Sequence, residues 1–398
     1  MNLVVIGTGY VGLVTGVGFA SLGNKVSFID LDKNKIVKLQ NKEIPIFEPG
    51  LEEHFQNEDT FSRMSFTSSY DDVKWDSTDV AFVCVQTPNN LETNSVDTRF
   101  LESAISEISQ LDNSKIVVTV KSTIPPYEIE KVCKKVGMDK NEITFNPEFL
   151  REGTAIEDFF KPDRIVIGGN DPEKLTVLRE LYKSFEAEVI ETDPISSQLI
   201  KYLANTYLPL RLSFVNEAAR LIDYSGGNQK DVLKGVGLDS RIGSHYFRPS
   251  PAWGGSCFPK DLIEVNNFYN DGAITLPLIS NIIDSNIQQT TWTVEKLIKI
   301  FNENSLTSIV LIGAAFKEDT DDLRNSPTLD IYRMLEDKEI KTQIYDEMVE
   351  LDSYDSIEDL NNIADKSLVA LMYPVKKQLM EKIESVISKT GSILYTPW

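Results

Sequence analysis

The sequence predicts an α/β protein, with two Rossmann-like, doubly wound domains joined by a long central helix and a helical middle domain. Two observations carry this prediction. Short β-rich runs that end in glycine begin at Asn2 and at Ser308, and strands and helices alternate after each of them. Between them, from Ser196 to Tyr224, apolar residues recur at helical spacing. We therefore expect domains over residues 1–192, 193–304 and 305–398.

The first β-rich run leads into a glycine-rich turn. Asn2–Ile6 is followed by Gly7-Thr8-Gly9-Tyr10-Val11-Gly12, a helical pattern, and a second strand, Lys25–Ile29, that ends on Asp30. In a dinucleotide-binding fold, the first glycine permits the turn, the second admits the pyrophosphate, and the third lets helix and sheet pack closely. Asp30 can accept hydrogen bonds from ribose hydroxyls, and with Asp32 it would repel a 2′-phosphate. The pattern predicts an NAD site rather than an NADP site.

Two further buried strands end in residues with hydroxyl groups. Asp79–Val85 leads to Gln86-Thr87-Pro88, and Lys115–Val120 leads to Lys121-Ser122-Thr123. Because open α/β sheets bind their ligands at the carboxyl ends of parallel strands, we expect both strand ends to face the cofactor. Each threonine could equally be a turn residue or a helix cap.

The segment Asn146–Gly153 also follows a strand, and it contains Glu148, Arg151 and Glu152. Two carboxylates with an arginine between them could bind a polar ligand such as a sugar, or act as acid and base in a proton relay. A solvated loop with an internal ion pair explains the same spacing.

A cysteine follows two glycines in Gly254-Gly255-Ser256-Cys257-Phe258-Pro259-Lys260-Asp261. The glycines would let the backbone approach a ligand closely. The thiolate is the reactive form of cysteine, the ammonium of Lys260 would favour it, and Asp261 could take or steer a proton. The alternative is a small buried residue, which is the usual state of an isolated cysteine. The nucleotide site elsewhere in the chain favours the nucleophile.

The composition excludes several classes of protein. Forty Lys and Arg residues against 61 Asp and Glu residues give a net charge of −21, which argues against nucleic acid or an anionic membrane as a partner. We recognise no signal peptide and no run of about 20 apolar residues that could span a membrane. Three cysteines and two histidines provide neither a disulfide framework nor a metal-ligand cluster. We expect a cytoplasmic protein without a bound metal.

The predicted helix from Ser196 to Tyr224 would be about 40 Å long, and it has more apolar positions than one covering layer needs. We expect it to form the centre of a homodimer. Lys201 and Asn205 are one helical turn apart, so they share a face. The strand Ser308–Ile312 ends in Gly313 without the rest of the glycine fingerprint, so we expect no second dinucleotide site.

These motifs together resemble the UDP-glucose/GDP-mannose dehydrogenase family. The resemblance covers nearly the whole chain, and it rests on Gly7–Leu13, Glu48-Pro49-Gly50-Leu51, Lys121–Thr123, Pro147–Gly153, Lys201–Asn205, Asp239–Gly243, Gly254–Asp261 and the segment from Phe316-Lys317 to Arg324. It implies a four-electron oxidation of a sugar-nucleotide primary alcohol to a carboxylate, with two NAD used in turn. The implied substrate is UDP-glucose, which would give UDP-glucuronate, and GDP-mannose or another sugar nucleotide is the alternative. A non-catalytic nucleotide-binding protein on the same fold is the alternative from a different class.

The resemblance also implies roles for individual residues. Cys257 would form a thiohemiacetal and then a thioester, which water hydrolyses. Asp261 and Lys201 would transfer protons or stabilise an oxyanion, Asn205 would donate to the reacting oxygen, and Thr123 with Glu152 would position water. The implied NAD contacts are Gly7, Gly9, Tyr10, Val11, Gly12, Asp30, Lys35, Thr87, Thr123, Glu152, Lys260 and Arg324. The implied substrate contacts are Glu148, Phe149, Leu150, Arg151, Glu152, Lys201, Asn205, Arg241, Tyr246, Phe247, Arg248, Pro249, Ser250, Gly254 and Lys317.

The sequence departs from the family pattern in two places. Gln86 stands where a small residue often precedes the Thr-Pro pair, which could alter the affinity for the cofactor. Ser250-Pro251-Ala252-Trp253 replaces a more glycine-rich approach to Gly254, which puts the preference for sugar or base in doubt. Ser256 and Lys260 do not fit the N-acetylmannosamine branch of the family, which tends to have a histidine and a residue other than lysine in this stretch.

Overall fold

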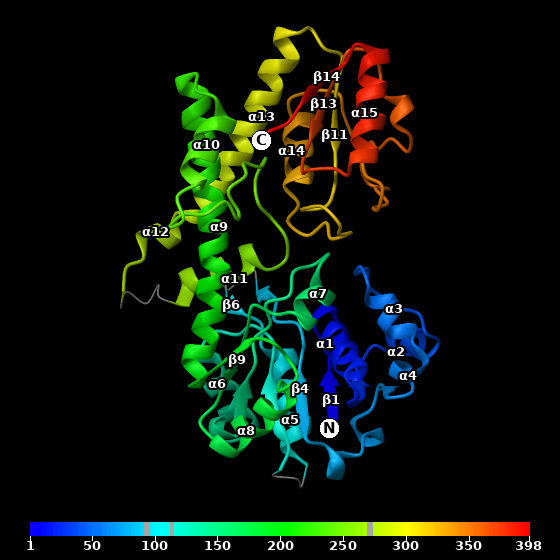
Figure 1. Ribbon diagram of the computed structural model, residues 1–398, viewed down its shortest axis with the longest axis vertical. Coiled ribbons are helices and arrows are strands. Elements are labelled where there is room, and N and C mark those ends of the chain that lie inside the picture. Colours follow the sequence, from blue (N-terminus) through cyan, green and yellow to red (C-terminus); the bar gives the residue numbers. More distant parts are fainter. Residues whose placement is uncertain (91–94, 112–114, 269–273) are drawn as a thin grey trace. The chain divides into compact units, whose positions relative to one another are not determined.

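The computed structural model describes residues 1–90, 95–111, 115–268 and 274–398 (Figure 1). The chain divides into two compact units, Met1–Ala204 and Asn205–Trp398, and each is built on a mainly parallel sheet. The α/β class and the second parallel sheet are therefore confirmed. The three domain limits expected from the sequence stay a prediction. None of the helices in the described ranges is long and apolar enough to cross a membrane.

The first unit contains an eight-stranded sheet in the order β10-β9-β8-β7-β4-β1-β2-β3. Neighbouring strands pair in parallel except β8 and β9, which are antiparallel. A separate two-stranded sheet pairs β5 with β6. The strands are β1 (Asn2–Ile6), β2 (Lys25–Ile29), β3 (Met64–Thr67), β4 (Val80–Val83), β5 (Asn89–Asn90), β6 (Ser95–Val96), β7 (Val117–Val120), β8 (Ile143–Phe145), β9 (Arg164–Gly168) and β10 (Glu188–Thr192).

Helices cover both faces of this sheet, which explains why its strands read as continuous apolar runs. Leu3 and Val5 of β1 pack into one hydrophobic cluster, whereas Val4 and Ile6 pack into the other. The first cluster includes residues of α1 (Tyr10–Ser21), α2 (Lys33–Gln40), α3 (Leu51–Gln56), α4 (Glu58–Phe61), α7 (Ala155–Phe160) and α8 (Pro172–Leu181). The second includes residues of α5 (Arg99–Ser109) and α6 (Glu128–Val136).

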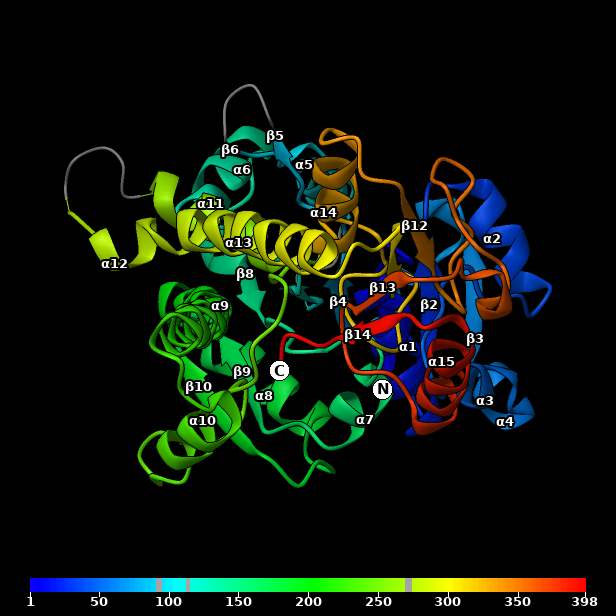
Figure 2. The ribbon, with the colours of Figure 1, turned by 90° about the horizontal axis from the view of Figure 1, so that it is seen from above.

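The long helix α9 (Pro194–Ser225) begins in the first unit and continues in the second; Figure 2 shows it nearly end-on. It extends slightly beyond the predicted range at both ends and runs through Pro209. Asp193 fixes its start, because the side chain accepts hydrogen bonds from the Ser196 amide at 2.9 Å and the Ser196 hydroxyl at 2.6 Å. The helices that follow are α10 (Gln229–Gly237), α11 (Phe258–Phe268) and α12 (Pro277–Ser280).

The second unit contains a four-stranded parallel sheet in the order β12-β11-β13-β14. Alternate residues of β11 again pack into separate clusters, with Ile309 and Leu311 on one face and Val310 and Ile312 on the other. The strands are β11 (Ser308–Ile312), β12 (Thr342–Tyr345), β13 (Ser367–Leu371) and β14 (Ile393–Tyr395). α13 (Ile282–Glu303) and α14 (Pro327–Glu336) cover the first face, and α15 (Lys377–Thr390) covers the second.

Candidate active site

The glycine-rich turn between β1 and α1 has two kinds of glycine. Gly7 has φ +97°, and a Cβ there would lie 2.6 Å from the carbonyl oxygen of Cys84. A Cβ at Gly12 would lie 1.9 Å from the carbonyl oxygen of Gly7. A Cβ at Gly9 would meet no other described part of the chain within 4 Å. Gly7 and Gly12 therefore serve packing, whereas Gly9 leaves open space where a pyrophosphate fits against the backbone.

Asp30, at the end of β2, is held beside this turn. Its Oδ2 accepts hydrogen bonds from the Thr8 amide at 2.8 Å and the Thr8 hydroxyl at 2.6 Å, and its Oδ1 accepts one from the Asp32 amide at 3.0 Å. Burial disfavours the carboxylate, but these donors and the nearby Lys35 outweigh it and hold the pKa of Asp30 below its usual value. The acid is therefore ionised and fixed at the place where it can accept from a ribose. The residues present fit a bound NAD.

The ends of β4 and β7 are joined by hydrogen bonds from their hydroxyl residues. Thr87 Oγ1 donates to the Thr123 carbonyl at 2.8 Å, and Ser122 Oγ donates to the Val85 carbonyl at 2.6 Å. The structure thus places Thr87 and Thr123 side by side, as expected for two strands that face one ligand. It also gives Thr87 a role in holding the backbone of Thr123.

A buried lysine lies beneath this edge of the sheet. Lys121 Nζ donates to the Asn146 side-chain oxygen at 2.8 Å and to the Asn146 carbonyl at 3.2 Å. The Tyr182 hydroxyl donates to the same side-chain oxygen at 2.5 Å. Burial lowers the pKa of Lys121 to about 8, although the neighbouring Cys84 and Glu148 oppose the shift. This network holds Asn146, at the start of the segment that contains Glu148 and Glu152, the two carboxylates expected to act in the site.

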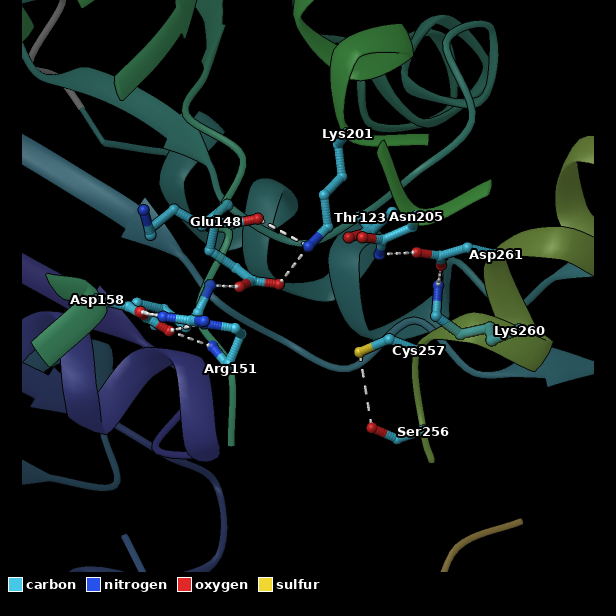
Figure 3. A network of polar contacts seen from close by, with 12 residues as sticks. Thr123, Glu148, Arg151, Asp158, Lys201, Asn205, Ser256, Cys257, Lys260 and Asp261 are labelled. Carbon is cyan, nitrogen blue, oxygen red and sulfur yellow. Dashed lines mark hydrogen bonds and ion pairs between the residues drawn. The ribbon is translucent and has the colours of Figure 1, made fainter. Parts of the chain in front are cut away.

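Glu148 forms a buried ion pair with Lys201 of α9 (Figure 3). Lys201 Nζ donates to Glu148 Oε1 at 2.8 Å and to the Glu148 carbonyl at 2.7 Å, and the two side chains are 5% and 9% exposed. Glu148 Oε2 accepts from the Leu150 amide at 2.6 Å. Lys201 and Thr123 also line one small pocket. Glu148, Lys201 and Thr123 are therefore brought together within the first unit.

The rest of the segment is arranged by other contacts. The Phe149 ring lies under the Arg164 guanidinium, 3.6 Å from its central carbon. Arg151 Nε donates to Asp158 Oδ2 at 3.0 Å. Two other arginines predicted to bind ligands are held in the same way, Arg241 by Asp239 at 2.6 Å and Arg324 by Asp322 at 2.7 Å. A phosphate or carboxylate ligand would have to compete with these aspartates.

Cys257 lies immediately before α11 in the second unit. Its side chain is exposed, and its carbonyl accepts the first helical hydrogen bond, from the Asp261 amide at 2.9 Å. The Ser256 hydroxyl lies 3.6 Å from the sulfur. An exposed thiol at a helix N-terminus is a favourable place for an anionic sulfur, because the helix amides point toward it. The alternative of a small buried cysteine is therefore wrong for Cys257.

A buried polar network lies on the first turn of α11 (Figure 3). Asp261 is 1% exposed, accepts from Asn205 Nδ2 at 2.6 Å, and pairs with Lys260 at 2.7 Å. Lys260 also pairs with Glu264 at 3.2 Å. Burial would lower the pKa of Lys260, but the two carboxylates outweigh it and raise the pKa above its usual value. Lys260 therefore stays an ammonium, and Asp261 is held by one cation and one amide.

The structure explains why both positions before the cysteine are glycine, which the sequence did not reveal. A Cβ at Gly254 would lie 2.0 Å from the Asn325 carbonyl oxygen. Gly255 has φ +91°, and a Cβ there would lie 2.9 Å from the Phe316 ring. The close approach at these glycines is thus made by the chain itself, rather than only by a ligand as the pattern suggested.

The predicted substrate loop, residues 246–250, is anchored to helices. The Ser250 amide donates to the Asn216 side-chain oxygen at 2.8 Å, and Gln289 donates to the Ser250 carbonyl at 2.9 Å. The Phe247 ring packs under the Arg211 guanidinium, 5.5 Å from its central carbon. In the same unit Arg248 lies 4.0 Å from Glu318, Lys317 lies over the Phe316 ring, and Tyr246 has a positive φ of 54°.

Several residues of these networks have no role that the sequence alone predicts. Glu48 accepts hydrogen bonds from Tyr10, Gly153 and Ala155, although its Glu-Pro-Gly-Leu motif indicates only family resemblance. Glu264 shares the Lys260 ammonium with Asp261, and the spacing of four residues on a helix could have indicated that pair. Asn216 stands out in the sequence only as a polar residue on a long apolar helix.

The glycine turn and the acid after the second strand are the features of a dinucleotide-binding α/β protein. The exposed cysteine beside the buried Asn-Asp-Lys network is a candidate nucleophile. The chain belongs to the UDP-glucose/GDP-mannose dehydrogenase family. Its NAD binding domain matches residues 1–186, its central domain 195–288 and its UDP binding domain 310–388. The protein is accordingly an NAD-dependent oxidoreductase.

Individual relatives agree with this membership. The UDP-glucose 6-dehydrogenase of Rickettsia felis is 36% identical over 353 residues, which are 87% of this chain and 78% of that protein. The UDP-glucose 6-dehydrogenase TuaD of Bacillus subtilis is 34% identical over 408 residues, with coverage of 98% and 87%. A solved structure of a UDP-glucose dehydrogenase from Pyrobaculum islandicum has a TM-score of 0.82 at 33% identity and covers 94% of this chain and 89% of that one.

Proposed function

We propose that the protein is an NAD-dependent UDP-glucose 6-dehydrogenase, which oxidises the C6 alcohol of UDP-glucose to the carboxylate of UDP-glucuronate. The observation that carries the proposal is the exposed Cys257 beside the buried Asn205–Asp261–Lys260 network, in a chain with an NAD binding domain. The relatives named UDP-glucose 6-dehydrogenase and the UDP binding domain support the substrate.

NAD, when bound, accepts one hydride in each of two successive oxidations. In the first, the C6 alcohol loses a hydride and a proton and becomes an aldehyde. The thiolate of Cys257 then adds to the aldehyde carbon, and the oxygen takes a proton, which gives a thiohemiacetal. Loss of a second hydride and the hydroxyl proton gives a thioester. Water adds to that carbon, the C–S bond breaks, and the products are the carboxylate and the free cysteine.

The side chains around these steps have distinct proposed roles. Lys201, with its ammonium held by Glu148, would donate to the oxygen that becomes negative when the thiolate or water adds. Asn205 would donate to the same oxygen. Asp261 would take and return protons, and Thr123 with Glu152 would position the attacking water. Lys260, Lys35 and Arg324 remain proposed NAD contacts.

A panel of sugar nucleotides tests this function. Purified protein is mixed with NAD and with UDP-glucose, GDP-mannose or a UDP-N-acetylhexosamine, and NADH is counted against the acid identified by mass spectrometry. We expect UDP-glucose to be preferred and two NADH to form for each UDP-glucuronate. A preference for GDP-mannose would indicate a GDP-mannose dehydrogenase instead. No turnover with any of these sugar nucleotides would favour a non-catalytic nucleotide-binding protein.

We also propose that α9 forms the centre of a homodimer. Its most exposed apolar residues recur at helical spacing, at Leu203, Tyr207, Phe214, Leu221 and Tyr224, and each is at least 54% exposed. This is the spacing of a helix that packs against another helix. Light scattering at micromolar concentration should give about twice 44.8 kDa. A Leu221→Glu substitution at the exposed face should shift the mass toward that of one chain, and a wild-type monomer would contradict the proposal.

A further inference from the structure

Glu48 has a buried carboxylate in the loop before α3. Its side chain is 5% exposed, its Oε2 accepts from the Gly153 amide at 2.7 Å, and its Oε1 accepts from the Ala155 amide at 2.7 Å. The Tyr10 hydroxyl donates to Oε2 in a short hydrogen bond. These partners are two amides and a phenol rather than a cation. Burying a carboxylate costs free energy unless hydrogen bonds satisfy its oxygens. We therefore expect Glu48 to hold all three donors in place.

The donors belong to two separate parts of the first unit. Tyr10 is the first residue of α1 and directly follows Gly9 of the glycine-rich turn. Gly153 and Ala155 follow Glu152, and Gly153 has φ +86°, which fixes a turn directly after that carboxylate. Glu48 therefore connects the cofactor turn to the backbone that carries Glu152.

Tyr10 is also influenced by Glu152 itself. Burial, the hydrogen bond to Glu48 and the charges of Glu48 and Glu152 all raise the pKa of Tyr10. The hydroxyl consequently remains protonated and serves as a donor, with the Arg151 carbonyl a further 3.4 Å contact. The Glu152 charge is thus close enough to influence the same phenol that Glu48 holds.

We propose that Glu48 is a positioning residue, which sets the distance between the NAD turn and Glu152 through Tyr10, Gly153 and Ala155. This inference rests on the proposed function, because it concerns the water that Glu152 would position for thioester hydrolysis. Glu48 touches neither substrate nor cofactor in this account. It acts by holding one backbone segment and one phenol in fixed relation.

Two substitutions separate the parts of this contact. Glu48→Gln keeps the shape of the side chain but replaces one acceptor oxygen by an NH₂ group, which would face an amide N–H or the phenol. The segment of residues 151–155 must then shift. Tyr10→Phe removes one hydrogen bond and leaves both amides bound to Glu48. Glu53→Gln, at an exposed position of α3, is the matched control.

The first measurement does not require activity. Hydrogen exchange of peptides that cover residues 149–156 should be at least about tenfold faster in Glu48→Gln than in wild type, because a lost hydrogen bond of about 1.4 kcal/mol corresponds to a factor of ten. It should be nearly unchanged in Tyr10→Phe and Glu53→Gln. Unchanged exchange in Glu48→Gln, with a melting temperature like that of wild type, would overturn the proposal.

The second measurement uses turnover with NAD and UDP-glucose. We expect Glu48→Gln to lower kcat about tenfold or more with little change in the KM for NAD, and a covalent substrate adduct to accumulate on the protein because its hydrolysis is slow. Tyr10→Phe alone should lower kcat relative to wild type. Added to Glu48→Gln, it should lower kcat no further. Normal wild-type turnover with an unchanged kcat in Glu48→Gln would overturn the positioning role alone. A wild-type protein that oxidises no sugar nucleotide would instead overturn the proposed function.

Discussion

The two parallel sheets of this protein begin with the same backbone arrangement. In the first, the Gly7 amide donates to the Ile29 carbonyl at 2.8 Å, and Asp30 accepts from the Thr8 amide at 2.8 Å. In the second, the Gly313 amide donates to the Tyr345 carbonyl at 2.8 Å, and Asp346 accepts from the Ala314 amide at 2.7 Å. Both glycines have a positive φ, +97° and +100°. The strand order β2-β1-β4-β7 also corresponds to β12-β11-β13-β14.

The sheets differ in the segment after the glycine and in the contacts of the aspartate. Helix α1 begins at Tyr10, directly after Gly9, whereas the fully described segment after Gly313 reaches its next helix only with α14, at Pro327. A Cβ at Gly313 would lie 2.5 Å from the Tyr373 ring, and the Tyr373 hydroxyl donates to Asp346 at 2.9 Å. The Tyr373 phenol thus takes the place of the Thr8 hydroxyl, which donates to Asp30 Oδ2 in the first sheet.

From this difference we expect that an aspartate held by backbone amides is not sufficient for a dinucleotide site. The site also needs a helix N-terminus directly after the glycines. The first sheet meets this condition and the second does not. The sequence predicted a single dinucleotide site only because the glycine fingerprint after the strand Ser308–Ile312 is incomplete.

The largest expected effect comes from removing the nucleophile, which should stop acid formation without changing cofactor binding. Cys257→Ser should lower the rate of acid formation by about a thousandfold or more, because a hydroxyl is a far weaker nucleophile than a thiolate at neutral pH. The affinity for NAD should be unchanged, since that site belongs to the first sheet. Steady-state turnover and NAD fluorescence titration check the two parts. A variant that makes acid at the wild-type rate would remove Cys257 from the mechanism.

The second test changes the two corresponding aspartates. Asp30→Asn should weaken NAD binding by about tenfold, because a neutral amide accepts ribose hydroxyl hydrogen bonds less strongly than a carboxylate. Asp346→Asn should leave NAD affinity unchanged and cost about 1–3 kcal/mol of unfolding free energy, since the partly buried Tyr373 hydroxyl loses a charged acceptor. Equal effects of the two substitutions on NAD affinity would contradict the comparison.

A smaller effect concerns two lysines, one in each unit: Lys121, which is buried, and Lys260, which is partly buried. Lys121 is bonded to neutral oxygens and its pKa is lowered to about 8, whereas Lys260 lies between two carboxylates and its pKa is raised. An unfolded lysine has a pKa of about 10.4, so between pH 8 and about 10.4 the unfolded chain binds the Lys121 proton more strongly than the folded chain does. The Lys121 contribution should therefore make the protein more stable as pH rises through that window.

Lys121→Met should remove this contribution. Denaturant unfolding at several pH values gives the difference in unfolding free energy between wild type and variant, and we expect that difference to grow in favour of wild type from about pH 8 to about pH 10. Lys260 should not contribute in this window, because its stabilisation is lost only as pH rises above about 10.4. A difference independent of pH would show that Lys121 titrates normally.

The parts of the structure that depend on local sequence were predictable. The glycine turn, Asp30 and the range of α9 follow from spacing alone, and Asp193-Pro194 explains the start of α9. The predicted strands Asp79–Val85 and Lys115–Val120 are present in shortened form, as Val80–Val83 and Val117–Val120.

Contacts between distant segments could not be predicted in this way. Gly153 bonds to a residue 105 positions away, and the Gly254 and Gly255 backbone packs against Asn325 and Phe316, far along the chain. Such pairings leave no periodic signal in the sequence. The residues around Cys257 suggested it as a nucleophile and Asp261 as a proton carrier, whereas the role of Lys201 came from family resemblance. All three roles remain proposals.

The most direct test of the comparison is the number of NAD molecules that one chain binds. Calorimetric titration of the wild-type protein with NAD, without a sugar nucleotide, should give one site per chain, and Asp30→Asn should weaken that site while Asp346→Asn leaves it unchanged. Two NAD sites per chain, or one site that weakens only in Asp346→Asn, would contradict the assignment of the cofactor to the first sheet.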